Sequence, residues 1–517
     1  MISKCKKAKI RSTIFQHLDG VAISTTLLSL QKNGIIDFII NTKTFDSIKI
    51  LKNFKCNIGY LNIALRLLSS QGLLIQRIQI DGKNINYTIT EKGEFVFKNI
   101  KKYEFCLEWY KFILNLNFDA NNNAKQSKLK KYKKNIKNNN DTKYNLYITK
   151  HLNGILISPL IAKCGFENIF TSNQKLKKFI KKNDFNKILG EILSIEGWLD
   201  DCYNYTDQGK YAFKISSSYG VTISYLETFI NVNNLIFHDP TILKINTGLN
   251  KEIHINRKMN VWGSGGSHKP YFKHIDKIIK DIFNQPIESQ PKGIADMGCG
   301  NGDFLIHINS IIKNTKRGKN IKQFPLYLIG ADFNQEALEE TNDNLTTNSI
   351  KPYLIKADIS NPHKFAKDLQ TKYKIDLKEC LNIRSFLDHN RIYLSPKNTE
   401  YHESKSTCTF SKKGKWISNY ILEKNLIEHF KKWKPYIEKF GLIALELHTI
   451  DPALTSKNLG VSISTAYDAT HGYSDQYIIE IDNYLKCIKK AELKYNKNLF
   501  KKYPNNELAS ISINFIK

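Results

Sequence analysis

The chain has 517 residues, with 78 Lys and Arg against 48 Asp and Glu, so its formal net charge is +30. This length predicts roughly two to four domains, each with its own core. A composition of 41% hydrophobic and 24% charged residues excludes a wholly disordered protein. No apolar run approaches the ~20 residues that a membrane-spanning helix needs, which excludes an integral membrane protein.

The start of the chain and the cysteines indicate the compartment. The basic first residues are not followed by an apolar segment or a small-residue cleavage site, so we expect no secretory signal. The nine Cys are scattered and form no C-x-x-C pair, which argues against a disulfide framework and against a thiolate zinc site. We therefore expect a cytoplasmic protein.

The positive charge leaves several kinds of partner open. A nucleic acid, an anionic surface or an acidic protein would each suit it. The simplest alternative is a general abundance of Lys, Asn and Ile along the whole chain, which would say nothing about a binding surface. The motifs therefore have to decide between these interpretations.

Two segments of the N-terminal half, residues 61–98 and 185–214, share one pattern. In each, an amphipathic helix ends at a glycine, and a Thr-x-x-Gly turn follows that leads into an aromatic run. A helix ended by glycine and followed by a β-wing is typical of a winged-helix unit. We expect a mainly helical N-terminal region of two winged-helix-like parts, residues 1–117 and 144–254. Such units bind DNA in some proteins and form dimerisation or lid modules in others.

Between these parts, residues 118–143 are of low complexity and carry eight Lys against two Asp. A segment with so few large apolar residues cannot bury enough surface to fold by itself. We expect a disordered insertion, which takes up part of the positive charge.

From residue 255 to residue 517 the pattern changes to strands that alternate with helices. This alternation predicts an α/β domain with a parallel sheet. Ten of the thirteen His also lie beyond residue 250, so we expect the chemistry in this half of the chain.

Upstream of the first of these strands, a Gly- and Ser-rich stretch at residues 261–268 precedes a helical pattern. A loop of this kind at a helix N-terminus is suited to binding a carboxylate, so Gly263 and Ser264 are candidate cofactor residues. The alternative is an ordinary linker turn between the two halves.

A glycine-rich loop follows the apolar strand that begins near residue 293. It starts after Asp296 and contains Gly298, Gly300 and Gly302, and an apolar helical pattern comes next. Glycines allow the tight turn and the close backbone approach that a nucleotide-like ligand needs at a helix N-terminus. A carboxylate at the position of Asp296 can hold an amino group.

The next two strands each end at an acidic residue, Asp332 and Asp358. In doubly wound folds the first position binds ribose hydroxyls, and the second is placed to bind an adenine amine. The 30 residues from Gly302 to Asp332 exceed the usual ~20, and a polar insert at residues 314–323 accounts for the difference. The series resembles class I S-adenosylmethionine (SAM)-dependent methyltransferases more than NAD enzymes, because the glycines follow a leading Asp.

Three further clusters follow the predicted later strands, where this fold holds its site. Asp388 and His389 come after the fourth strand, and Glu446 and His448 end the fifth. A third cluster contains His471 and Gln476. Oxygen and imidazole donors without Cys suit Mn or Fe(II). Each His taken singly is more often a structural hydrogen-bonding group than a ligand.

The motifs RSFLDHNR and DATHGYSDQY carry a more specific resemblance. Residues 255–517 resemble the metal-dependent C-methyltransferase domains of polyketide synthase loading modules of the apratoxin and saxitoxin type. The resemblance implies methyl transfer from SAM to the α-carbon of a malonyl-type acyl group on an acyl carrier protein. A metal would stabilise the enolate as a Lewis acid.

The resemblance also assigns roles to residues. His471 and Gln476 match the family's metal-ligand segment, and Asp388 is our inferred third ligand. His448 or His389 would act as the general base.

Other functions remain as hypotheses. A metal-free O-methyltransferase of small molecules would use the same fold and a His base. An RNA-modifying methyltransferase would suit the charge, but the fourth strand lacks the N/D-P-P-Y/F motif that is typical of amino methylation on bases. A cofactor-binding protein without activity is the last alternative, and the intact acidic positions argue against it.

Overall fold

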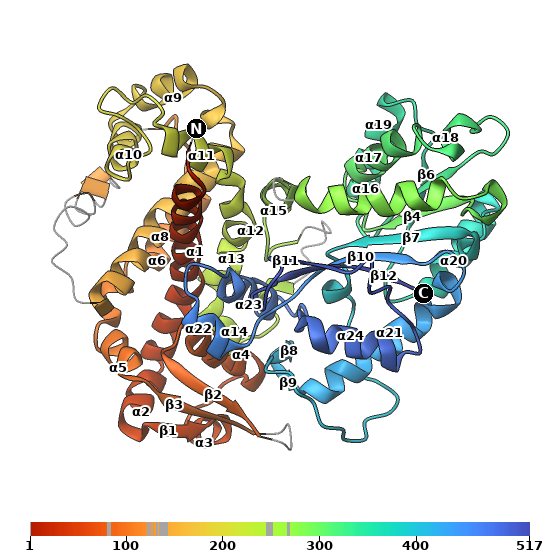
Figure 1. Ribbon diagram of the computed structural model, residues 1–517. Helices are drawn as coiled ribbons and strands as arrows, with labels where there is room; N and C mark the ends of the chain where they lie inside the picture. Colours follow the sequence, from red (N-terminus) through yellow and green to blue (C-terminus); the bar gives the residue numbers. More distant parts are fainter. Residues whose placement is uncertain are drawn as a thin grey trace. The chain divides into compact units, whose positions relative to one another are not determined.

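The computed structural model describes residues 2–79, 84–120, 126, 127, 129, 130, 133, 143–244, 252–265 and 269–517. The chain forms two units (Figure 1). The first unit comprises Met1–His268, Thr409–Trp416 and Asp451–Asp475, and the second comprises Lys269–Cys408, Ile417–Ile450 and Gln476–Lys517. Three stretches of the predicted C-terminal domain, residues 255–268, 409–416 and 451–475, thus belong to the first unit.

The first unit is mainly helical, as predicted. Its longest helices are α1 (Lys4–Lys32) and α8 (Lys143–Phe166). A Cβ atom at Gly20 of α1 would lie 2.5 Å from the Cα atom of His151, and one at Gly154 of α8 would lie 2.2 Å from the carbonyl oxygen of His17. The two helices therefore pack backbone against backbone, and only glycine fits at their closest approach.

Shorter helices surround this pair: α2 (Ile35–Thr42), α3 (Ser47–Asn53), α4 (Ile58–Ser70), α5 (Glu91–Lys98), α6 (Cys106–Leu114), α9 (Asn173–Ile180), α10 (Asp184–Ile195), α11 (Asp207–Lys214), α12 (Gly220–Ile223), α13 (Leu226–Ile230), α14 (Val232–Phe237), α15 (Arg257–Gly265), α22 (Pro452–Lys457) and α23 (Ser464–Gly472). A small antiparallel sheet has the order β1-β3-β2, with β1 at Thr44–Asp46, β2 at Leu74–Ile78 and β3 at Ile85–Ile89. Strands β8 (Phe410–Lys412) and β9 (Lys415–Ile417) form a separate pair.

The first predicted winged-helix segment folds as α4, β2, β3 and α5. Helix α4 is followed by Gly72 with a φ of 70°. The Thr90 hydroxyl donates to the Gly72 carbonyl oxygen (2.8 Å) and accepts from the Gly93 backbone N–H (2.9 Å), so Thr90 caps α5. The aromatic run after the Thr-x-x-Gly turn is thus a short helix.

The second segment repeats these contacts. Gly197 follows α10 with a φ of 72°. The Thr206 hydroxyl donates to the Gly197 carbonyl oxygen (2.6 Å) and accepts from the Gly209 backbone N–H (3.0 Å), and so caps α11. An isolated antiparallel bridge between Leu199 and Tyr205 takes the place of the wing. The predicted relationship between the two segments is confirmed.

The predicted insertion at residues 118–143 falls largely outside the described residues, namely at 121–125, 128, 131, 132 and 134–142. Of its described residues, Phe118 and Leu129 are buried. The Lys133 ammonium pairs with the Glu191 carboxylate at 2.5 Å. Part of this segment therefore packs against the rest of the first unit.

The second unit contains a seven-stranded sheet with the order β11-β12-β10-β7-β4-β5-β6. Strands β4, β5, β6, β7 and β10 are parallel, and β12 is antiparallel to β10. The strands are β4 (Gly293–Met297), β5 (Tyr327–Asp332), β6 (Tyr353–Lys356), β7 (Cys380–Ser385), β10 (Leu442–Leu447), β11 (Lys501–Tyr503) and β12 (Ile511–Ile516). This confirms the predicted α/β fold with a mainly parallel, class I methyltransferase sheet.

Helices cover both faces of this sheet. Figure 1 shows α16 (Lys269–Phe283), α17 (Asp303–Ile312) and α19 (Gln335–Thr347) on one face and α21 (Asn419–Ile437) and α24 (Ile481–Lys490) on the other. The remaining helices of the unit are α18 (Lys316–Lys319) and α20 (Pro362–Tyr373). Strands β4 and β10 are almost entirely buried, as strands covered on both faces should be.

The strand order reverses between β4 and β7. The chain continues from β4 to β5 on one side of the sheet and from β7 to β10 on the other. In open parallel sheets such a reversal opens a crevice at the carboxyl ends of the strands, where ligands bind. The predicted glycine loop and the Asp388 cluster both follow strands at this point.

No helix within the described ranges is long and apolar enough to cross a membrane.

Candidate active site

The loop after β4 has the backbone that the glycines predict. Gly298, Gly300 and Gly302 all have positive φ values (82°, 57° and 81°), which only glycine adopts readily. A Cβ atom at Gly300 would meet nothing within 4 Å, so the loop leaves open space above this residue. Gly302 then starts α17. This loop can admit a ligand against its backbone at a helix N-terminus.

Two carboxylates lie beside this loop. Asp332, at the end of β5, accepts a hydrogen bond from the Gly300 backbone N–H (3.1 Å), which joins the loop to the neighbouring strand. Asp296, on β4, is 2% exposed, and its Oδ1 atom has no hydrogen-bond partner among the described residues. Burial, together with the nearby charge of Asp332, raises the pKa of Asp296 to about 7.

These features fit SAM. A buried carboxylate oxygen without a donor is costly unless a ligand supplies one, and the amino group of the methionine part of SAM would do so. The ribose contact of Asp332 stays a prediction. Asp358 follows β6 and is half-buried, and its Oδ1 accepts from the Ser360 backbone N–H (2.8 Å). The adenine contact of Asp358 stays a prediction.

The other predicted cofactor loop has a different structure. Gly263 and Ser264 lie in the last turn of α15 in the first unit, so the loop prediction is wrong for these two residues. A Cβ atom at Gly263 would lie 2.5 Å from the Val221 nitrogen, so the close packing of α15 on α12 explains this glycine. The Ser264 hydroxyl donates to the Val261 carbonyl oxygen. Their role toward SAM remains a prediction, and residues 266–268 lie outside the described residues.

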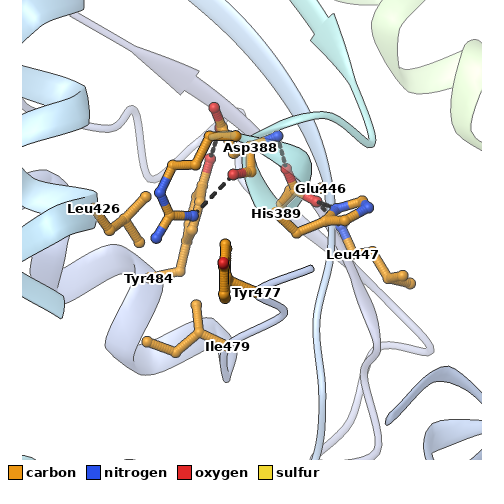
Figure 2. Close-up of a pocket in the computed structure, with 9 residues that line it drawn as sticks. Asp388, His389, Leu426, Glu446, Leu447, Tyr477, Ile479 and Tyr484 are labelled. Carbon is orange, nitrogen blue, oxygen red and sulfur yellow. Dashed lines mark hydrogen bonds and ion pairs between the residues drawn. The ribbon is translucent and has the colours of Figure 1, made fainter. Parts of the chain in front are cut away.

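A small pocket, with room for about one water molecule, opens in the second unit where β7 and β10 end (Figure 2). Its walls are mostly charged or aromatic and come from the turn after β7, from β10, from α21 and from the segment around α24. The lining residues are Asp388, His389, Arg391, Leu426, Glu446, Leu447, Tyr477, Ile479 and Tyr484. Of the two histidines predicted as the base, His389 lines this pocket, whereas His448 does not.

His389 and Glu446 form the pair in this pocket with the clearest chemical use. The Nδ1 atom of His389 lies 2.5 Å from Oε1 of Glu446, as Figure 2 shows. Glu446 also accepts from the backbone N–H groups of Asp388 and Leu447, both at 2.7 Å. The carboxylate is therefore held in place and orients the imidazole ring.

The protonation pattern of this pair follows from its contacts. An ionised carboxylate only accepts hydrogen bonds, so Nδ1 of His389 carries the proton. In that tautomer Nε2 is the nitrogen that can take up a further proton. This is the arrangement of a general base oriented by a carboxylate.

Asp388 lies next to this pair but has other partners. Its Oδ1 atom is 3.0 Å from Nη1 of Arg384 and 3.1 Å from Nε2 of His429, and its Oδ2 accepts from the Tyr484 hydroxyl (2.6 Å). Burial raises the pKa of Asp388, but the charge of Arg384 and these hydrogen bonds outweigh it, so the pKa is held well below its usual range. Asp388 is thus a buried structural anion.

This environment does not suit a metal ligand. A cation bound by Asp388 would have to displace the Arg384 guanidinium or the Tyr484 hydroxyl. In the described part of the chain, no group of three or more His, Cys, Asp and Glu side chains is arranged to hold a metal ion. Asp388 therefore does not fit the role of third ligand that the sequence predicted for it.

The other two predicted ligands are both buried. His471, on α23 in the first unit, is 5% exposed, and its Nδ1 atom lies 2.8 Å from the Tyr467 carbonyl oxygen and 3.0 Å from the Thr470 hydroxyl. Gln476, in the second unit, is 9% exposed. Both stay predictions as metal ligands.

His448 is fully buried and hydrogen-bonded at both ring nitrogens. Nδ1 lies 3.0 Å from the Ile479 carbonyl oxygen, and Nε2 lies 2.7 Å from the Ser512 hydroxyl on β12. Burial lowers the pKa of His448 to about 4, so the ring is neutral at physiological pH. These contacts join β10 to its neighbours and favour His389 over His448 as the base.

Sequence patterns did not assign a role to two members of the site. These are Glu446, as the partner of His389, and Arg391, as part of the pocket wall. Both stand inside clusters that the sequence pointed to, next to His448 and His389 respectively. The signal for Arg391 was its place in RSFLDHNR, a cation close to two predicted site residues.

Comparison with known families agrees with this geometry. Residues 252–514 match the family described as the AprA MT2-like domain, which is half of the chain. Residues 10–76 match the AprA N-terminal domain and residues 153–239 the AprA winged helix domain. The chain belongs to the AprA-type methyltransferases. The apratoxin-type resemblance is thereby confirmed, and the winged-helix prediction is confirmed for the second of the two parts, whereas the first matches the N-terminal domain instead. The enzyme is a SAM-dependent methyltransferase.

Among solved structures, methyltransferases match this chain at low identity and with TM-scores below 0.5. A Nostoc punctiforme protein assigned to the O-methyltransferases is 13% identical, with 72% of this chain and 100% of that chain covered and a TM-score of 0.43. The mitomycin 7-O-methyltransferase MmcR is 10% identical, with 72% and 97% covered and a TM-score of 0.39. The CurJ carbon methyltransferase is 10% identical, with 80% and 97% covered and a TM-score of 0.32. No curated protein matches the sequence.

Proposed function

We propose that this AprA-type enzyme transfers a methyl group from SAM to the α-carbon of a malonyl-type acyl group on an acyl carrier protein. The observation that carries the proposal is the His389–Glu446 pair in a pocket at the carboxyl edge of the sheet. The glycine loop after β4 lies at the same edge, in the crevice where the strand order reverses. Family membership supports the same chemistry.

The residues supply the steps that carbon methylation needs. Nε2 of His389 takes the proton from the α-carbon, and Glu446 stabilises the imidazolium that forms. The electron pair left on the carbon attacks the sulfonium methyl group, the S–CH3 bond breaks, and its electrons stay on the sulfur of S-adenosylhomocysteine. Methyl transfer itself depends mainly on holding the carbon and the methyl group in line.

Whether the activity requires a metal is a separate part of this proposal. The resemblance implies Mn or Fe(II) with His471 and Gln476 as ligands, but Asp388 does not fit as their third partner. We derive no step through a metal. The activity of chelator-treated enzyme tests this part. Unchanged activity would exclude a metal requirement, and a loss of activity that Mn or Fe(II) restores would establish one.

The test of the main proposal is intact-mass analysis of a malonyl-loaded carrier protein incubated with the enzyme and SAM. We expect a gain of one or two methylene units, which disappears in His389→Ala. The control is His363→Ala, an exposed histidine on α20 whose Nδ1 atom contacts the Tyr436 hydroxyl at 2.8 Å. An unmodified carrier, together with methylation of a small hydroxylated acceptor, would contradict the proposal and favour O-methylation.

A further inference from the structure

Arg391 is a buried cation in the wall of the active-site pocket. It lies in the turn after β7, lines the same pocket as His389 and Glu446, and is 3% exposed. A buried arginine normally pairs with a carboxylate, because removing its charge from water is costly.

Among the described residues, the guanidinium of Arg391 donates hydrogen bonds to neutral groups only. Nε donates to the Asn425 side-chain oxygen (2.8 Å), and Nη1 donates to the backbone carbonyl oxygen of Asp388 (2.9 Å). Nη2 is buried and has no hydrogen-bond partner among the described residues. The Tyr477 ring lies near the guanidinium, 5.7 Å from its carbon to the ring centroid.

The two nearby carboxylates, Asp388 and Glu446, already have other hydrogen-bond partners. Asp388 is paired with Arg384 and accepts from Tyr484. Glu446 accepts from His389 and from two backbone N–H groups. The charges of Asp388 and Glu446 stabilise the guanidinium without direct contact, but its buried Nη2 retains an unmet N–H donor in the wall of the pocket. A carboxylate that enters the pocket would accept from this donor.

We propose that Arg391 binds the free carboxylate of the acyl substrate, so that the enzyme selects carboxylated (malonyl-type) acyl groups over neutral ones. This inference rests on the proposed function. Arginine suits a carboxylate because its planar fork offers parallel N–H donors. The α-carbon is bonded directly to the carboxylate carbon. A carboxylate held by Arg391 thus brings the C–H bond into the small pocket that His389 lines.

Calorimetric binding of two probes tests this role. Malonyl-pantetheine carries the carboxylate, whereas acetoacetyl-pantetheine has an acidic α-carbon and no carboxylate. We expect the wild type to bind malonyl-pantetheine more tightly. Arg391→Gln should weaken that binding by about 10- to 100-fold, as loss of a charged hydrogen bond does. The affinity for acetoacetyl-pantetheine should stay within about twofold of the wild-type value. Arg391→Lys keeps the charge without the fork and should fall in between.

The control is Arg317→Gln in the same unit. Arg317 is also a buried arginine, but its three guanidinium nitrogens all donate, to Gln290, Phe324, Pro325 and Pro291. The SAM affinity and the thermal unfolding midpoint of each variant show whether it folds. If Arg391→Gln does not fold, two results carry the test: the preference of the wild type for malonyl-pantetheine, and weaker binding of malonyl-pantetheine by Arg391→Lys than by the wild type.

Two results would overturn the inference. One is equal binding of both probes by the wild type, and the other is a folded Arg391→Gln protein that binds malonyl-pantetheine normally. The binding measurement does not depend on which atom is methylated. A methyl group found on oxygen would therefore refute the proposed function, whereas the role of Arg391 would still be decided by the affinities.

Discussion

Asp296 and Asp332 stand at the ends of neighbouring strands, and their proximity gives the cofactor site a pH dependence. Burial and the charge of Asp332 raise the pKa of Asp296 to about 7. We expect the ionised form to bind the amino group of SAM. Protons would then compete with SAM for this carboxylate below that pH, and the competition would end above it.

The first prediction follows from this competition. Affinity for S-adenosylhomocysteine should rise roughly eightfold between pH 6.0 and 7.5, since a group with a pKa of about 7 goes from mostly protonated to mostly ionised over this interval. Calorimetry at both pH values measures it. Asp296→Asn should bind weakly at both and lose the pH dependence. An affinity of the wild type that does not change with pH would show that Asp296 does not contact the amino group.

The second prediction concerns His389 as the base. His389→Ala should lower the single-turnover rate about 10²- to 10⁴-fold, because a general base typically contributes this much. The affinity for SAM should stay unchanged, since the glycine loop and its carboxylates are intact. His363→Ala should keep the wild-type rate. If His389→Ala retained most of the activity while His448→Gln lost it, the assignment of the base would have to be reversed.

At the scale of elements, the two winged-helix-like segments depend on glycines for a steric reason. A Cβ atom at Gly93 would lie 2.1 Å from the Leu73 carbonyl oxygen, and one at Gly209 would lie 1.8 Å from the Trp198 carbonyl oxygen. Both glycines are in short helices capped by threonine. At each of them the helix backbone passes close to the residue that follows the preceding glycine turn, Leu73 after Gly72 and Trp198 after Gly197. Real side chains do not come so close to a backbone oxygen, so the chain would have to move.

The third prediction compares these glycines with Gly197. Gly93→Ala and Gly209→Ala should each destabilise the first unit by about 2–3 kcal/mol through steric overlap. Gly197→Ala should cost only ~1–2 kcal/mol, because nothing lies within 4 Å of its Cβ position and only the positive φ of 72° opposes alanine. Calorimetric unfolding measures all three. A smaller effect at Gly209 than at Gly197 would contradict this account of the repeat.

The elements also show how far the sequence could predict the structure. The glycine loop and the acidic strand ends were predictable because they depend on neighbouring residues along the chain. The helical state of Gly263 was not, since it reflects packing of α15 against α12. The choice between His389 and His448 and the unmet donor of Arg391 depend on partners such as Ser512 and Asn425, which the chain brings near only by folding.

At the scale of the whole molecule, only part of the net charge of +30 can bear on the choice of partner. Eight Lys lie in the insertion at residues 118–143, most of which is outside the described residues. Much of the remainder fits a general abundance of lysine. A net positive charge would suit the proposed acidic carrier protein, since complementary charge speeds the encounter of two proteins.

The fourth prediction tests that use of the charge. The kcat/KM for a malonyl-loaded carrier should fall several-fold as the ionic strength rises from about 0.05 to 0.5 M, because salt screens the attraction between the proteins. The same parameter for malonyl-pantetheine, which lacks the carrier, should change little. Equal salt dependence for both substrates would show that charge does not guide docking.

The central claim is that the methyl group goes to carbon, and carbon-13 NMR of the product tests it most directly. The enzyme would act on a carrier loaded with malonyl labelled at the α-carbon, with SAM labelled at the methyl group. We expect a one-bond carbon–carbon coupling between the two labels in the wild-type product and its absence with His389→Ala. A labelled methyl group attached to oxygen, without that coupling, would contradict it.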